Sequence, residues 1–270
     1  MLYLGLDHAG TRVEGWLVDS AGRLLARAAG AGVEEARGPC LEAAAGHPVV
    51  SMAAAPEGLD LELPTCPREH ALLAGALAGE PGLLIRGGEQ VAVLALDRSG
   101  GLRVLPGEAG ELGLEPLRER VRSLAGPGGP PAGRRLQERM ARHEDLLEAL
   151  FDLASFPGPD PDLRGLLVAQ ARRLVELARR ARARMMPGGR LRGSWTGGLM
   201  RAPLLDLFQQ EVFRHLPEVC WAAPRLPPVA GAVLLARACG PDRRGDPLGA
   251  LLRQRPALRG FVTGLCDGLG

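Results

Sequence analysis

The chain has 270 residues, of which 46% are hydrophobic and 3% aromatic, and its formal net charge is +2. This length can bury a sizeable core and suggests one large domain or two lobes. The small net charge gives no bulk electrostatic argument for a nucleic acid or an anionic membrane as partner. With so few aromatic residues, the core must consist mainly of Leu, Val and Ala, which favours a helix-rich architecture.

All 33 basic residues are Arg, and neither Lys nor Asn occurs. This composition is typical of a G+C-rich genome and resembles that of thermophile proteins, in which thermolabile Asn is depleted. Clusters of Arg are weaker evidence for a binding site in this chain, because Arg takes every basic position that Arg and Lys share in other proteins. We therefore interpret the Arg-rich segment 172–184 as the solvated face of a helix, with RNA or membrane binding as the minor alternative.

The five cysteines are odd in number and form no C-x-x-C pair, so they indicate neither a disulfide framework nor a zinc site. The N-terminal residues do not have the pattern of a signal peptide. No window approaches the roughly 18 apolar residues that a membrane span needs. We expect a cytoplasmic protein.

The first part of the chain predicts mainly strands. An apolar run ends at Asp7, an alternating run follows, and a D-S-A-G turn leads into a third run, which predicts an antiparallel meander. Next we expect a strand, a helix, another strand and a hairpin, at 49–55, 68–79, 83–86 and 91–105.

The second part predicts mainly helices. After a helix that starts near residue 110 and a Gly/Pro-rich break, we expect two long amphipathic helices at 134–155 and 163–186. Mixed structure follows: a strand before Gly197, a helix at 203–216, a strand near 218–223 and a helix at 227–238. The tail at 240–270 either packs as a helix or lies loosely on the surface.

Four segments, in this order, carry a resemblance to a known family: DHAGT at 7–11, the stretch from AGAL at 74–77 to RGGEQ at 86–90, SWTGGL at 194–199, and RLPPVAGAVLLA at 225–236. Their order and spacing resemble the BadF/BadG/BcrA/BcrD-type ATPase family, which includes the N-acetylglucosamine kinases. The resemblance covers most of the chain outside 110–185 and the tail.

This resemblance implies an α/β, two-lobed actin-like fold of ribonuclease-H-like lobes, with ATP in the cleft between them. The expected lobes are 1–107 and 108–270, the second with a helical insert at about 111–186 and the tail 240–270. The implied cofactors are ATP and magnesium, and the implied partner is a small-molecule sugar. A homodimer is suggested by the resemblance alone.

The resemblance also implies roles for individual residues. Asp7 would hold magnesium, and the other cofactor-binding residues would be Gly10, Thr11, Gly87 and Gly88 at the phosphates and Gly197 and Gly198 at the adenosine. The residues alone are also compatible with purely structural roles. Residues 7–11 fit a plain hairpin turn, and the later glycines fit a helix cap or a packing turn.

Several positions depart from the family pattern. His8 and Ala9 stand where the family has glycine, and their Cβ atoms would crowd a phosphate. Glu89 in the second loop would repel a phosphate unless a metal ion or Arg86 compensates. The family's general-base Asp corresponds to Arg68, which cannot accept a proton at neutral pH.

Two carboxylates remain weak candidates for a catalytic role. Glu69 is a displaced base if the alignment shifts by one residue, and otherwise it is a solvated carboxylate in the first turn of a helix. Glu108 lies in a segment that matches the family's sugar-binding stretch only in part. The sequence therefore supports two hypotheses. The first is an ATP-dependent kinase or ATPase resembling N-acetylglucosamine kinase, in which the degenerate loops and the missing Asp favour loss of sugar phosphorylation. The second is an inactive member that binds a ligand or a protein. Whether the protein is an enzyme stays open.

Overall fold

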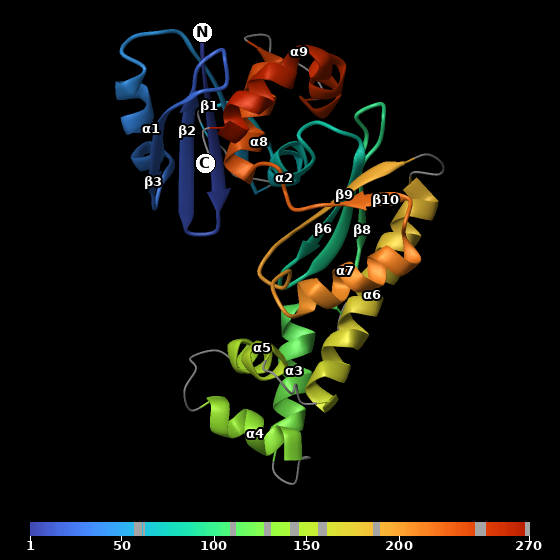
Figure 1. Ribbon diagram of the computed structural model, residues 1–270. Coiled ribbons are helices and arrows are strands. Elements are labelled where there is room, and N and C mark those ends of the chain that lie inside the picture. Colours follow the sequence, from blue (N-terminus) through green and yellow to red (C-terminus); the bar gives the residue numbers. More distant parts are fainter. Residues whose placement is uncertain are drawn as a thin grey trace. The chain divides into compact units, whose positions relative to one another are not determined.

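The computed structural model (Figure 1) describes residues 1–56, 61, 63–108, 112–126, 131–140, 146–155, 161–185, 190–240 and 247–267. Two compact units make up the chain. Unit 1 comprises Met1–Leu84, Leu94–Arg103 and Ala222–Gly270, and unit 2 comprises Ile85–Val93 and Val104–Trp221. The lobe boundary that the sequence suggests at residues 107 and 108 stays a prediction.

The first sheet has the strand order β3-β2-β1-β4-β5. Its first three strands pair antiparallel, whereas β4 pairs parallel with both β1 and β5. The predicted meander and the strand after it are confirmed, whereas β5 was not predicted. The strands are β1 (Leu2–Ala9), β2 (Arg12–Val18), β3 (Leu24–Gly30), β4 (Val49–Ala55) and β5 (Thr65–Pro67).

Helices cover both faces of this sheet (Figure 1). Alternate residues of a strand point to opposite faces. Leu4 and Leu6 of β1 accordingly pack in one core with α1 (Val33–Ala43), while Met52 of β4 packs in a second core with α2 (Arg68–Leu77) and α8 (Pro228–Cys239). Helix α1 was not predicted, because Pro39 lies inside it and reads as a helix breaker.

Two glycines let α2 and α8 approach closely. A Cβ atom on Gly75 would lie 2.6 Å from the Pro227 carbonyl oxygen, and one on Gly231 would lie 2.0 Å from the Ala71 carbonyl oxygen. These distances are far inside van der Waals contact, so the packing requires glycine at both positions. Helix α9 (Pro247–Asp267) packs against α8, so this part of the tail is a packed helix and not a loose surface segment.

The second sheet has the strand order β10-β9-β6-β7-β8, and β9 and β10 pair in parallel. All five strands lie where the alternating or apolar runs predict them. They are β6 (Gly82–Gly87), β7 (Val91–Leu96), β8 (Leu102–Pro106), β9 (Leu191–Thr196) and β10 (Val219–Trp221).

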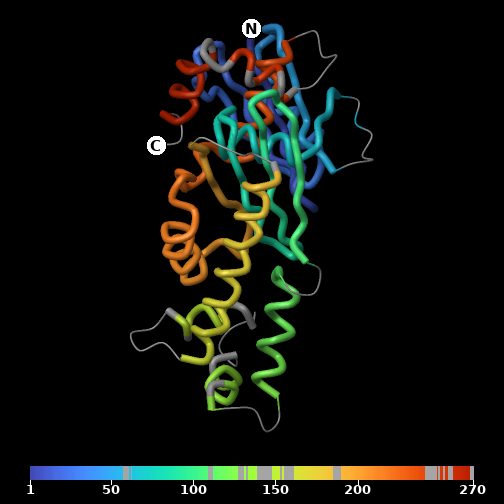
Figure 2. Tube along the Cα trace, turned by 90° about the vertical axis from the view of Figure 1, so that its right-hand side faces the viewer, coloured from blue at the N-terminus to red at the C-terminus, as the bar shows by residue number. Residues whose placement is uncertain are grey.

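The long helix α6 (Pro161–Met185) connects the other helices of unit 2 (Figure 2). It packs against α7 (Leu204–His215) and also contacts α5 (Leu146–Ser155). Helix α5 in turn packs against α3 (Leu114–Leu124) and α4 (Pro131–Met140). The single helix expected at 134–155 is wrong, because α4 and α5 are separate helices that pack against each other. Periodicity alone does not show a change of direction where no Gly or Pro marks it. In the described part of the chain, no helix is long and apolar enough to cross a membrane.

Candidate functional site

The first predicted loop is a tight hairpin turn. Strand pairing extends from Asp7, opposite Glu14, to Ala9, opposite Arg12, so only Gly10 and Thr11 remain in the turn. Gly10 has a φ of +63°, a left-handed conformation that favours glycine. A Cβ atom on Gly10 would meet nothing within 4 Å. The glycine is thus required by the turn's backbone and not by a neighbouring atom.

Asp7 and Arg68 form a bidentate ion pair in unit 1. The Nε of Arg68 donates to Oδ1 of Asp7 at 2.9 Å, and its Nη2 donates to Oδ2 at 3.3 Å. The Asp7 side chain is 8% exposed and the Arg68 side chain 33%. Strand β1 supplies the carboxylate, and the first residue of α2 supplies the guanidinium. Arg68, which stands at the position of the family's general base, thus contacts Asp7, the residue predicted to hold magnesium.

This geometry bears on the implied magnesium ion. Mg²⁺ prefers six oxygen ligands in an octahedron and binds through one or two carboxylates. Both oxygens of Asp7 already face a cation, and the described residues contain no group of three or more His, Cys, Asp or Glu side chains placed to hold a metal. With Arg68 in this position, the residues do not fit a magnesium ion at Asp7.

His8, one residue after Asp7 in β1, offers an unsatisfied polar atom on the opposite face of the sheet. Its Nδ1 is buried and has no hydrogen-bond partner among the described residues. Buried polar atoms are nearly always hydrogen-bonded, so an orphaned one indicates a position for a ligand or water. The His8 side chain is thus a candidate contact for a molecule bound at the end of β1.

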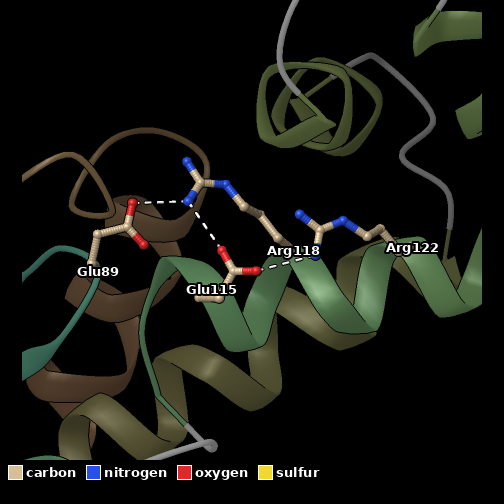
Figure 3. Close-up of polar contacts among 4 residues, drawn as sticks. All are labelled: Glu89, Glu115, Arg118 and Arg122. Atoms are coloured by element: carbon tan, nitrogen blue, oxygen red, sulfur yellow. Dashed lines mark hydrogen bonds and ion pairs between the residues drawn. The ribbon is translucent and has the colours of Figure 1, made fainter.

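The second predicted loop carries a network of ion pairs (Figure 3). Arg118 of α3 donates through Nη1 to Glu89 at 2.8 Å and to Glu115 at 3.4 Å, and Arg122 donates to Glu115 at 3.1 Å. The hydrogen bond from Arg122, with that from Arg118, lowers the pKa of Glu115. Arg118 therefore supplies the charge compensation for Glu89 that was expected from Arg86 or a metal ion.

Backbone contacts join the glycines of unit 2. The Leu199 N–H donates to the Gly87 carbonyl oxygen at 3.0 Å. Gly197 has a φ of +98°, and a Cβ atom there would lie 2.1 Å from the same oxygen. Packing alone therefore explains Gly197. Gly198, by contrast, has nothing within 4 Å of its Cβ direction, and Gly88 has only an ordinary contact at 3.7 Å.

The remaining candidate carboxylates differ in surroundings. Glu108 accepts a hydrogen bond at 2.9 Å from Arg180 of α6. The residues that follow it, 109–111, lie outside the described part of the chain. Glu69 lies in the first turn of α2, where the helix dipole favours a carboxylate. No geometry here assigns either residue a catalytic role.

A common pattern links three of these carboxylates. Asp7, Glu89 and Glu108 each pair with an arginine that is distant in sequence. Arg118 and Arg180 were missed as partners because their helices gave only an amphipathic pattern, and periodicity does not show which distant side chain an exposed arginine meets. The structure brings together Asp7 with Arg68 in unit 1, and Gly87 with Gly197 in unit 2.

Comparisons with known proteins address the fold. No protein-family model matches the chain, and no curated protein matches it. Solved structures do match. A Chromobacterium violaceum protein described as an N-acetylglucosamine kinase is 22% identical, with a TM-score of 0.56 over 87% of this chain and 98% of that chain. A Cytophaga hutchinsonii protein described as a sugar kinase is 13% identical, with a TM-score of 0.59 over 93% of this chain and 98% of that chain.

A third similar structure contains ligands. It is a ROK family glucokinase from Streptomyces griseus in complex with glucose and AMPPNP, 18% identical, with a TM-score of 0.51 over 88% of this chain and 99% of that chain. These similarities establish the predicted fold class: the chain has the α/β fold of sugar kinases and actin-like ATPases, with two five-stranded sheets.

Proposed function

We propose that this protein binds ATP as a sugar-kinase-like ATPase does, but does not phosphorylate a sugar. The observation that carries the proposal is the bidentate pair between Asp7 and Arg68. A guanidinium is a permanent cation that recognises phosphate oxygens, and it cannot act as a general base. Arg68 would therefore occupy the position beside Asp7 that the resemblance implies for a magnesium ion, and it would offer guanidinium donors to a phosphate.

The fold supports the nucleotide part of this proposal. The Streptomyces griseus glucokinase was solved with the ATP analogue AMPPNP and with glucose. By analogy we assign Gly10 and Thr11 to the phosphates, together with Gly87 and Gly88. Gly198 is assigned to the adenosine, because the direction of its missing Cβ atom is open.

The test compares ATP turnover by the natural protein and by a restored variant. We expect no ADP above background from the natural protein with N-acetylglucosamine or glucose. We expect turnover to appear in the triple variant with Arg68→Asp, His8→Gly and Ala9→Gly, because it restores the carboxylate and the glycine loop of the family pattern. Sugar-dependent ADP release by the natural protein would refute the proposal.

A second candidate function follows from the loops themselves. The second loop carries the carboxylate of Glu89, which is 62% exposed. A carboxylate at this position disfavours phosphate. On this alternative the protein is an inactive relative that binds a different ligand or a protein, and it would show no ATP binding at millimolar concentration.

A further inference from the structure

The Arg-rich helix α6 borders a pocket that the proposed nucleotide site does not include. Helices α6 and α7 pack against each other in unit 2, and a pocket of about 510 Å³ opens between their charged side chains. Arg172 and Arg179 reach it from α6, and Glu211 and Arg214 reach it from α7. The simple interpretation of residues 172–184 as a solvated face does not account for this arrangement.

A buried carboxylate organises the pocket. The Glu211 side chain is only 9% exposed. Its Oε2 lies 3.5 Å from Nε of Arg172 and 3.5 Å from Nε2 of His215, and its Oε1 accepts a hydrogen bond from Nη1 of Arg214 at 3.3 Å. Because burial penalises an unpaired charge, Glu211 holds these side chains from two helices in place.

A second carboxylate positions the third arginine. Glu176 accepts two hydrogen bonds from Arg179, from Nε at 2.7 Å and from Nη2 at 2.9 Å. Three guanidinium groups thus face two carboxylates, which leaves one net positive charge in the pocket. A site with this balance attracts an anion and is not neutralised by its own residues.

Each arginine keeps donors for a ligand. Among the described residues, the pairs above engage Nε of Arg172, Nη1 of Arg214, and Nε and Nη2 of Arg179. The Nη groups of Arg172, Nη2 of Arg214 and Nη1 of Arg179 can therefore face solvent. All three side chains are more than half exposed. Guanidinium groups fixed on one side and open on the other are preorganised for an anion with several oxygens.

We propose that this pocket binds a small phosphorylated compound through Arg172, Arg179 and Arg214. A phosphate group presents three strong acceptor oxygens, which suits several converging guanidinium groups better than the two oxygens of a carboxylate. A nucleic acid is disfavoured, because the chain's formal net charge is only +2. None of the residues that line the pocket is assigned to the proposed nucleotide site, so the inference does not depend on the proposed function.

The test is calorimetric titration with inorganic pyrophosphate at constant ionic strength. We expect Arg172→Ala and Arg214→Ala each to weaken pyrophosphate binding by about tenfold or more, since each removes charge-assisted hydrogen bonds. The matched control is Arg164→Ala, which removes the same charge from an exposed position on the same helix and should change affinity by less than about twofold.

Two further variants keep the test decisive. If a variant at Arg172 or Arg214 fails to fold, Arg179→Gln provides the test, because Arg179 is exposed. This substitution removes the charge but keeps hydrogen-bonding groups, and it should weaken pyrophosphate binding. Arg68→Ala alters the proposed nucleotide site, and it should leave a separate pyrophosphate site intact. Absence of pyrophosphate binding at millimolar concentration would overturn the proposal. An equal loss in the Arg164→Ala control, or a loss only in Arg68→Ala, would also overturn it.

Discussion

Asp7 and Arg68 are 61 positions apart in sequence, and their pairing is the feature on which the functional account depends. Removal of one partner from a largely buried pair leaves the other charge without compensation. Because Arg68 is one-third exposed, water would partly solvate the Asp7 carboxylate that remains.

We therefore expect Arg68→Ala to lower the free energy of unfolding by about 1–3 kcal/mol, measured by urea denaturation. The control is Arg23→Ala, which breaks the more exposed pair with Asp19 and should cost less than about 1 kcal/mol. The double variant with Asp7→Asn should recover part of the loss, because the uncompensated charge is then gone. Equal costs for Arg68→Ala and Arg23→Ala would show that the Asp7 pair has no special energetic role.

Cysteine reactivity gives a second prediction at the residue scale. Burial raises the pKa of the Cys66 thiol to about 12, with smaller contributions from Cys239 and Asp7. Since the thiolate is the nucleophile, Cys66 should not react with a disulfide reagent at pH 8 in the folded protein, whereas exposed Cys220 should react rapidly. Thiol titration should lose its fast phase in Cys220→Ser. Rapid labelling of Cys66, identified by mass spectrometry, would contradict this.

At the scale of elements, the turn after β9 offers a matched pair of glycines. Gly197→Ala places a methyl group 2.1 Å from the Gly87 carbonyl oxygen at a positive φ, so it should destabilise the protein by at least about 2 kcal/mol. Gly198→Ala meets no atom within 4 Å and should change stability by less than about 0.5 kcal/mol. Thermal unfolding of both variants tests this prediction. A comparable loss in both would mean that the turn constrains the backbone at each position.

The same pair tests the adenosine assignment. If Gly198 lies against the nucleotide, a methyl group there should weaken ATP binding at least about tenfold without altering stability. Unchanged ATP affinity in Gly198→Ala would remove this residue from the proposed site.

The elements also show how far the sequence could predict the structure. The strands other than β5 and the helices α2, α7 and α8 followed from alternation, apolar runs and glycine turns. Helix α1 was missed because of Pro39, and the separation of α4 from α5 has no Gly or Pro to mark it. Among the site residues, Asp7 and Arg68 were singled out, but their contact joins β1 to α2. Only the fold brings them together, because no local pattern encodes a bond across 61 residues.

At the scale of the whole molecule, the chain combines the fold of sugar kinases with a changed set of charges. Similar structures include a glucokinase with a bound ATP analogue. Asp7, Glu89 and Glu108 each have an arginine partner within their own unit. On the proposed function, this fold binds a nucleotide but does not transfer its phosphoryl group.

Calorimetric titration with ATP, with and without magnesium, tests this account most directly. If Arg68 takes the place of magnesium beside Asp7, ATP should bind the natural protein with similar affinity in excess EDTA and in excess magnesium. Arg68→Ala should weaken that binding by at least about tenfold. Binding that requires magnesium and is lost in Asp7→Ala, but is unchanged in Arg68→Ala, would contradict the account and would indicate that Asp7 holds a metal-bound phosphate.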